Sequence, residues 1–364
     1  MSRWLLLLVL LVTDLKAEEP YLWENTLTLE SISNLSGGIE RGSVQLANLD
    51  VSLAIDTESA GWWKNGEVFV YLLGDYGRKD PAELTGGLQG ISNIAADNAI
   101  KIYEFWYQHY FLNDHIKLLT GLHDFNSTFY SLESAGLFNH PSFGIGPDTS
   151  QVTPSIFPTS AWTLHLTVNF ENLYVLAAVY DGVPGDPENP RGTHIQFNSG
   201  DGLFSAIEVG MAEEHRYKLG MGYWTLTATT ENPIDASQVD SNYGFYVIGE
   251  KYLTDNVAIF FQIGQADDSV NQLANYYGGG IVVFNAFADG DAIGLAYADA
   301  KNGDPFLNAN PELSRSETAI ELSYNYPWSD AFSSQLSLYQ IKDPDMNETL
   351  DDAYAAGVRL TISF

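Results

Sequence analysis

The C-terminal segment alternates strictly between two kinds of side chain. Apolar residues fill every second position from Tyr354 to Phe364, whereas the positions between them hold small or polar residues, Arg359 among them. Because successive side chains of a β-strand point to opposite faces, this segment predicts a strand with one apolar face and one polar face. The same alternation occurs at 163–170, 257–264 and 318–326.

Segments with this pattern recur about every 20 residues along the chain. They predict sixteen strands, at residues 26–36, 43–56, 66–74, 99–111, 115–126, 160–170, 173–181, 202–211, 216–228, 243–253, 256–266, 274–285, 291–299, 316–326, 331–341 and 353–364. An even number of two-faced strands about 10 residues long, with aromatic residues near their ends, is typical of an outer-membrane barrel.

A secreted β-sandwich or propeller is the alternative, because its strands also alternate. The predicted strands are longer than the roughly 5 to 6 residues usual in soluble sheets. In lipid, only closure of the sheet satisfies the backbone of every strand. We therefore predict an all-β chain that forms a transmembrane antiparallel β-barrel of about 16 strands, with long loops folded into the pore.

The N-terminus has the features of an export signal. Arg3 precedes an apolar stretch at Trp4–Val12, and Leu15–Ala17 offers a cleavage site. We predict a signal peptide at 1–17 and a barrel domain at 18–364. The apolar stretch is too short to span a bilayer, and no later stretch reaches the roughly 18 to 20 apolar residues of a transmembrane helix. The predicted location is the outer membrane of a Gram-negative bacterium.

Composition supports a surface that is only partly exposed to water. Charged residues make up 17% of the chain and aromatic residues 13%, whereas soluble domains carry about 25% charged residues. The formal net charge of −31 argues against nucleic acid as a partner. The chain has no cysteine, so no disulfide stabilises it.

The predicted connections alternate in length. Short turns such as Leu112–Asp114 and Pro327–Asp330 separate longer polar segments, and short turns of such barrels face the periplasm. The longest segment, 127–159, is rich in Gly, Pro, Ser and Asn and is too long for an idle connection. We expect it to fold into the pore mouth, with the insertion 76–98 and its possible short helix at Pro81–Leu84 beside it.

Several stretches resemble the carbohydrate-selective porin family of Gram-negative bacteria, the OprB type. They keep the order of the family and lie mainly in the first half of the chain, at 35–42, 88–94, 135–138, 142–148, 154–158 and 180–187. The second half is similar mainly in its strand rhythm. The resemblance implies a sixteen-stranded barrel narrowed by inward-folded loops, through which glucose and related sugars diffuse passively.

A sugar in a pore needs polar groups for its hydroxyls and aromatic faces for its C–H surface, held weakly enough for release. If Tyr103, Phe105 and Tyr107 face lipid, the residues that alternate with them in the 99–111 strand point into the pore. Those inward candidates for sugar contact are Glu104, Trp106 and Gln108. The alternative places Trp106 in an aromatic belt and makes Glu104 a solvated lumen charge.

Further candidates lie near the start of the long loop and in the next one. Asp124 and Asn126 share a parity beside the same wall, although Asp124 is equally suited to forming a turn. Arg191 is one of the rare basic residues and could set a transverse field across the constriction; an exposed loop position is the alternative. Lys101, Arg41 and Arg359 are weaker candidates of this kind.

The strand phases in 115–126 and 243–253 are ambiguous by one residue. A slip of one residue would reverse which side chains face the lumen.

The sequence offers no good case for catalysis. The seven His residues are scattered, and no metal-ligand spacing or nucleophile motif is present. We expect no enzyme activity, no catalytic residue, no metal and no cofactor. A general or cation-preferring diffusion porin is the first alternative function, and an outer-membrane barrel enzyme with a Ser-His pair, at His109 or His123, is the second.

The expected partners follow from the predicted location. They are small sugars in transit, outer-membrane lipid, and the assembly machinery through the terminal Phe364. Monomer and homotrimer both stay open.

Overall fold

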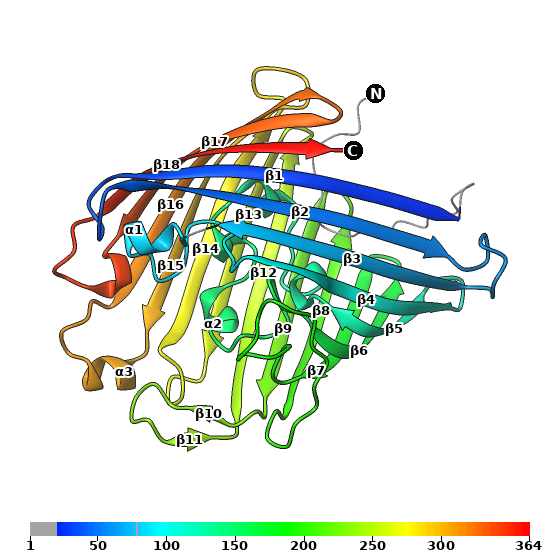
Figure 1. Cartoon of the computed structure of the whole chain (residues 1–364), viewed down its shortest axis with the longest axis horizontal. Helices are drawn as coiled ribbons and strands as arrows, with labels where there is room; N and C mark the ends of the chain where they lie inside the picture. The colour runs from blue at the N-terminus through cyan, green and yellow to red at the C-terminus, as the bar shows by residue number, and fades with distance from the viewer. Residues whose placement is uncertain (1–19, 78) are drawn as a thin grey trace.

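The computed structural model describes residues 20–77 and 79–364, so the predicted signal peptide at 1–17 lies outside the described residues. Sixteen strands form one closed antiparallel barrel (Figure 1). The strands are β1 (Tyr21–Ser36), β2 (Gly42–Asp56), β3 (Gly66–Gly77), β4 (Ala99–Phe111), β5 (Ile116–His123), β6 (Ala161–Phe170), β7 (Leu173–Asp181), β8 (Leu203–Glu213), β9 (Tyr217–Leu226), β12 (Asn242–Thr254), β13 (Val257–Ala266), β14 (Leu273–Phe284), β15 (Ala292–Asn302), β16 (Ser316–Ser329), β17 (Phe332–Lys342) and β18 (Ala353–Ser363). The predicted fold class is therefore confirmed.

Closure depends on the pairing of the first strand with the last. β1 and β18 run antiparallel, with Thr26 opposite Ser363 and Leu29 opposite Leu360. Beyond the strand, Phe364 donates its backbone N–H to the carbonyl of Asn25 at 3.1 Å. This pairing leaves the barrel without a free edge, as a lipid environment requires. None of the helices in the described part of the chain is both long and apolar enough to cross a membrane.

The two faces of the wall differ as the alternation predicts. Large apolar side chains on the outer face are exposed in the isolated barrel, among them Leu29, Phe105, Leu164, Ile207, Phe261 and Leu295. Polar side chains on the inner face are buried beneath the inserted loops, among them Glu30, Gln108, Glu208, Gln262 and Glu321. The outer face therefore suits lipid and the inner face suits water and polar contacts.

The structure also shows which side chains face the lumen in the two segments whose phase the sequence leaves ambiguous, 115–126 and 243–253. In β5, Leu118 is exposed on the outer face whereas Leu119 and His123 are buried inside. In β12, Phe245 is outside and Tyr246 is inside.

Two inserted segments fold into the barrel, as predicted. The long β5–β6 loop contains η1 (Phe125–Ser127), η2 (Ser134–Leu137), η3 (Pro141–Phe143) and the short helix α2 (Pro147–Ser150), and the β3–β4 insertion contains α1 (Ala82–Thr85). The segments lie side by side, because the Asn93 N–H donates to the Asn139 carbonyl at 2.8 Å and the Ser142 hydroxyl donates to Gln89 at 3.0 Å.

Apolar packing fixes the long loop against the wall. Phe125 and Phe129 stack with ring centroids 4.6 Å apart, and Tyr130 lies 4.3 Å from the ring of Tyr246 on β12. Each of these four side chains is almost completely buried. Side chains this large supply much of the driving force for docking the loop inside the barrel.

Some boundaries differ from the sequence prediction. β16 continues through Pro327 to Ser329, so the predicted turn Pro327–Asp330 shrinks to Asp330 and Ala331. The polar loops after β9 and β15 contain a small β10–β11 hairpin (Thr230–Glu231 and Gln238–Val239) and the helix α3 (Asp304–Ala309). Their alternating or apolar patterns are too short to be recognised in the sequence.

A charged side chain introduced on the outer face should destabilise the barrel by an amount that depends on its depth in the membrane. Leu295→Arg, on the outer face of β15 between Ile281 and Leu322 of the neighbouring strands, should lower the free energy of unfolding in lipid vesicles by about 2 to 4 kcal/mol, because an arginine deep in the hydrocarbon region is poorly solvated. Phe287→Arg, in the exposed β14–β15 turn, is the control and should change it much less. Equal effects in a denaturant titration would contradict the assignment of this face to lipid.

Candidate functional site

An aromatic and acidic cluster lines the inner wall of β3–β5. Trp106 stacks on Phe69 with ring centroids 4.9 Å apart, and its indole N–H donates to Oε2 of Glu104 at 2.9 Å. Gln108 lies on the same inner face, and all of these side chains are buried. Tyr71 donates its hydroxyl to Oδ1 of Asp50 at 2.6 Å. The wall thus presents aromatic faces together with carboxylate and amide groups.

A β-bulge changes the parity of β4. Ile102 pairs with Leu72 and Glu104 pairs with Tyr71, so Tyr103 has no partner on β3. The extra residue turns Tyr103 inward, where it is 3% exposed. The prediction that Tyr103 faces lipid with Phe105 and Tyr107 is therefore wrong, and the same bulge places Lys101 on the inner side.

Asp124 and Asn126 organise the base of the long loop. β5 ends at His123, so neither residue belongs to the strand predicted at 115–126. Asp124 caps η1 by accepting the Asn126 N–H at 2.6 Å, and Oδ2 accepts the Tyr103 hydroxyl at 2.5 Å. Burial raises the pKa of Asp124 to about 6, although these hydrogen bonds partly oppose the shift. The turn-forming alternative is thus what the geometry shows for Asp124.

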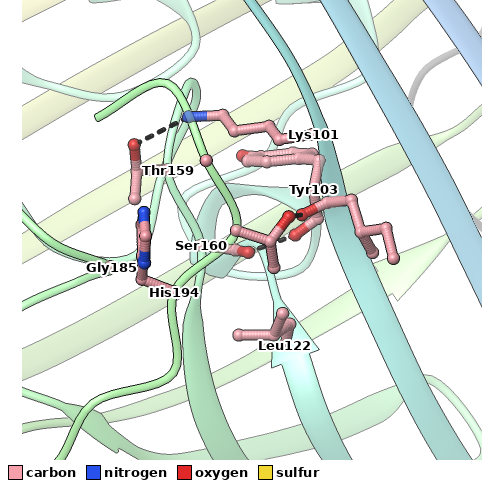
Figure 2. A pocket seen from close by; sticks show the side chains of 10 residues that line it. Lys101, Tyr103, Leu122, Thr159, Ser160, Gly185 and His194 are labelled. Carbon is pink, nitrogen blue, oxygen red and sulfur yellow. Dashed lines mark hydrogen bonds between the residues drawn. The ribbon is translucent and has the colours of Figure 1, made fainter. Parts of the chain in front are cut away.

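The two basic candidates lie apart from this cluster. Figure 2 shows Lys101 pointing toward Thr159, to which its Nζ donates at 3.2 Å; it also donates to the Pro190 carbonyl at 2.9 Å. Arg191 is exposed in the β7–β8 loop and makes no ion pair within the described ranges. Contacts therefore join Glu104 to Trp106 and Asp124 to Tyr103, but they join neither pair to Lys101 or Arg191.

Arg359, a weaker candidate, lies on the inner face as its parity indicates. It donates to Oε1 of Glu30 at 3.0 Å and to Oδ1 of Asn93 at 2.8 Å. Glu30 also accepts the hydroxyl of Ser92. This set fastens the β3–β4 insertion to the seam between β1 and β18.

A second group of inner-face carboxylates lies on β8, β12 and β16 and was not predicted from the sequence. Glu208 accepts the Tyr130 N–H at 2.9 Å, and Glu250 accepts the Ser134 N–H at 2.8 Å. Glu317 and Glu321 on β16 receive N–H groups of both inserted segments. The alternation in the sequence puts these carboxylates on the polar face of their strands, but it does not identify the loop residues that bind them.

One buried carboxyl group of the loop lacks a full set of partners. Asp148 in α2 lies against β13 where Gly264 leaves room, since a Cβ atom there would come within 2.1 Å of its Oδ1. Thr149 donates to Oδ2 at 3.1 Å, whereas Oδ1 has no partner. Burial raises the pKa of Asp148 to about 7.

A Ser-His contact exists, but not in a catalytic arrangement. Ser127 Oγ lies 3.2 Å from Nε2 of His123, yet its hydroxyl has a shorter bond to the Asp124 carbonyl at 2.7 Å. Nδ1 of His123 faces the Tyr180 hydroxyl at 3.1 Å rather than a carboxylate. Among the described residues, no group of His, Asp and Glu side chains is arranged to hold a metal ion.

The family profile of the carbohydrate-selective porins, OprB family, matches residues 40–364. The chain belongs to this family. The match covers every strand from β2 to β18 and both inserted segments. A search of curated proteins gives no match.

Solved structures of outer-membrane channels share this OprB-family fold. The high-pH structure of OprB from Pseudomonas putida superposes with a TM-score of 0.86 at 17% identity, over 95% of this chain and 94% of that one. The channel DcaP of Acinetobacter baumannii gives 0.63 at 8% identity, over 94% and 97%. A triple-mutant porin of Rhodopseudomonas blastica gives 0.58 at 10% identity, over 94% and 100%. Identities this low establish the barrel architecture alone.

The raised pKa of Asp148 predicts a pH-dependent stability. Its folded pKa of about 7 lies above the ordinary value of 3.8, so the folded protein binds more protons than the unfolded chain between these values. Stability should then fall as the pH rises from 4 to 7, by up to about 1.4 kcal/mol per pH unit from this group. Asp148→Asn should flatten that slope in denaturant titrations, whereas Asp330→Asn in an exposed turn should not. An unchanged slope in Asp148→Asn would contradict a neutral Asp148.

Proposed function

We propose that this porin lets small neutral carbohydrates of about the size of glucose diffuse passively across the outer membrane. The observation that carries the proposal is the inner wall of β3–β5, where Trp106 and Phe69 lie beside Glu104 and Gln108. Aromatic faces cover the apolar side of a sugar, and the polar groups replace water on its hydroxyls. The OprB from Pseudomonas putida, which shares the fold, supports the comparison only at the level of architecture.

Each predicted site residue has its own part in the proposal. Glu104, Trp106 and Gln108 provide sugar contacts, and Asp124 and Asn126 shape the loop that faces them. Lys101, with Arg191 beside Pro190, orders the outer end of the pore through the β7–β8 loop.

Cation-preferring diffusion is the second candidate function. Carboxylates predominate on the inner face, and the formal net charge of the chain is −31. Carboxylate-lined pores favour cations. Sugar passage and cation preference are compatible, because a neutral sugar is indifferent to the sign of the lumen potential.

The remaining partners belong to the same proposal. The apolar outer face contacts outer-membrane lipid, and Phe364 at the end of β18 serves as the signal for the assembly machinery. The protein is a channel. We propose that it has no enzyme activity, which is supported by the lack of an acid partner at the Ser127–His123 contact. The described wall offers no feature that favours a homotrimer over a monomer.

Liposome swelling tests the sugar pathway. Vesicles containing the refolded protein should swell faster in isotonic glucose than in a trisaccharide, and faster than in an uncharged amino acid once size is allowed for. Glu104→Gln should reduce glucose entry several-fold by replacing one carboxyl oxygen with an amide N–H₂ that cannot accept a hydrogen bond. Trp106→Phe should also reduce it by removing the indole N–H.

Glu213→Gln, at the end of β8 beside the β8–β9 turn, is the matched control, because its carboxylate pairs with Arg216 rather than with the inner wall, and should leave entry unchanged. If entry follows solute size alone and both inner-wall variants behave like wild type, the pore is a general diffusion channel. An absence of swelling would contradict a pore of any kind.

A further inference from the structure

The inner-face carboxylates of β8, β12 and β16 accept hydrogen bonds mainly from backbone N–H groups. We refer to Glu208, Glu250, Glu317 and Glu321 as the clasp carboxylates. All four are buried. One ion pair involves them among the described residues, between Lys218 and Glu208, and its atoms are 3.8 Å apart.

Three of the clasp carboxylates each hold two or more N–H groups. Glu250 accepts from Glu133 at 3.2 Å and from Ser134 at 2.8 Å. Glu321 accepts from Asn139 at 2.9 Å and from His140 at 2.8 Å. Glu317 accepts from Leu88 at 2.8 Å, Gln89 at 2.9 Å and Asp345 at 2.8 Å. Both oxygens of each carboxylate are used, which fixes the direction as well as the distance of each loop segment.

The N–H groups come from places where the loop has no internal acceptor for them. Those bound by Glu250 stand at the start of η2, and those bound by Glu321 come directly before η3. The first N–H groups of a helical turn lack a partner within the turn and favour a negative charge. The loop N–H groups therefore compensate the buried carboxylates, of which only Glu208 has an ion-pair partner among the described residues.

These contacts hold one side of the long loop at a fixed place in the barrel. β12 and β16 lie across the ring from β4, whose inner face carries Glu104 and Trp106. The loop is thus tied to the wall opposite the proposed sugar contacts. Movement of the loop away from β12 and β16 would change the open cross-section beside β4.

We propose that the clasp carboxylates are positioning residues that set the upper size limit for solutes. Glu208, Glu250 and Glu321 hold the long loop against β8, β12 and β16. Glu317 holds the β3–β4 insertion against β16. The inference rests on the proposed function only in assuming that the barrel conducts. It assigns the size limit to groups that touch no solute, whereas Glu104 and Trp106 act on sugars directly.

Single-channel conductance in potassium chloride tests the inference. Glu321→Gln and Glu250→Gln each replace one acceptor oxygen by an amide N–H₂, which cannot accept from the loop. Both variants should show a conductance raised by roughly twofold with noisier current, because a loosened loop opens the constriction. In liposome swelling, both variants should also admit the trisaccharide faster than wild type does. Glu213→Gln is again the control.

A tether distinguishes loop position from a general loss of stability. The chain has no cysteine, and Asn139 Nδ2 lies 3.2 Å from Ser337 Oγ on β17. Asn139→Cys with Ser337→Cys should form a disulfide that restores wild-type conductance to Glu321→Gln, and a reductant should abolish the rescue. The same tether in the wild-type background should change nothing. Unaltered conductance in Glu321→Gln, or no rescue by the closed disulfide, would overturn the inference.

Hydrogen exchange on the unmodified protein provides a test that needs no variant to fold. The amides of Ser134, Asn139 and His140 should exchange as slowly as amides within β12 and β16. Fast exchange there would overturn the inference. If instead glucose shows no preference while the conductance results hold, the proposed sugar selectivity fails and the clasp stands.

Discussion

The pairing of β1 with β18 is the constraint on which the rest of the structure depends. A sheet in lipid must close, because each unpaired N–H or carbonyl at an edge would have no partner. Once the ladder from Thr26–Ser363 to Asn34–Ala355 is made, every strand has two neighbours and one inner face. Everything that narrows the pore is then built by attaching loop segments to that inner face.

Closure of the barrel buries carboxylates on the inner face, and their negative charge must be compensated there. The inner face carries many carboxylates, and few basic residues of the described ranges reach them or the inserted loops from the wall, among them Lys101, Lys218 and Arg359. Backbone N–H groups of the long loop take the place of cations, with charge-assisted hydrogen bonds in a surrounding of low polarity. The acidic composition and the inserted loop are therefore two parts of one arrangement.

The aromatic and acidic wall of β3–β5 depends on a local irregularity. The bulge at Tyr103 brings two successive residues, Tyr103 and Glu104, to the inner side and turns Lys101 inward as well. A regular strand would have put Tyr103 toward lipid and left Asp124 without its hydroxyl partner. One extra residue thus joins the wall to the base of the long loop.

The barrel and its sixteen strands could be predicted from the sequence, because a period of two along a strand is a local property. The length and composition of 127–159 predicted its inward fold, and the alternation put Glu104, Trp106 and Gln108 on one face. The parity of Tyr103 and Lys101, the end of β5 before Asp124, and the N–H partners of Glu250 and Glu321 required the folded structure. A bulge is visible only against the partner strand, and a hydrogen bond between Glu321 and Asn139 joins residues 182 apart in the chain. Such pairings follow from closure of the sheet rather than from any local pattern.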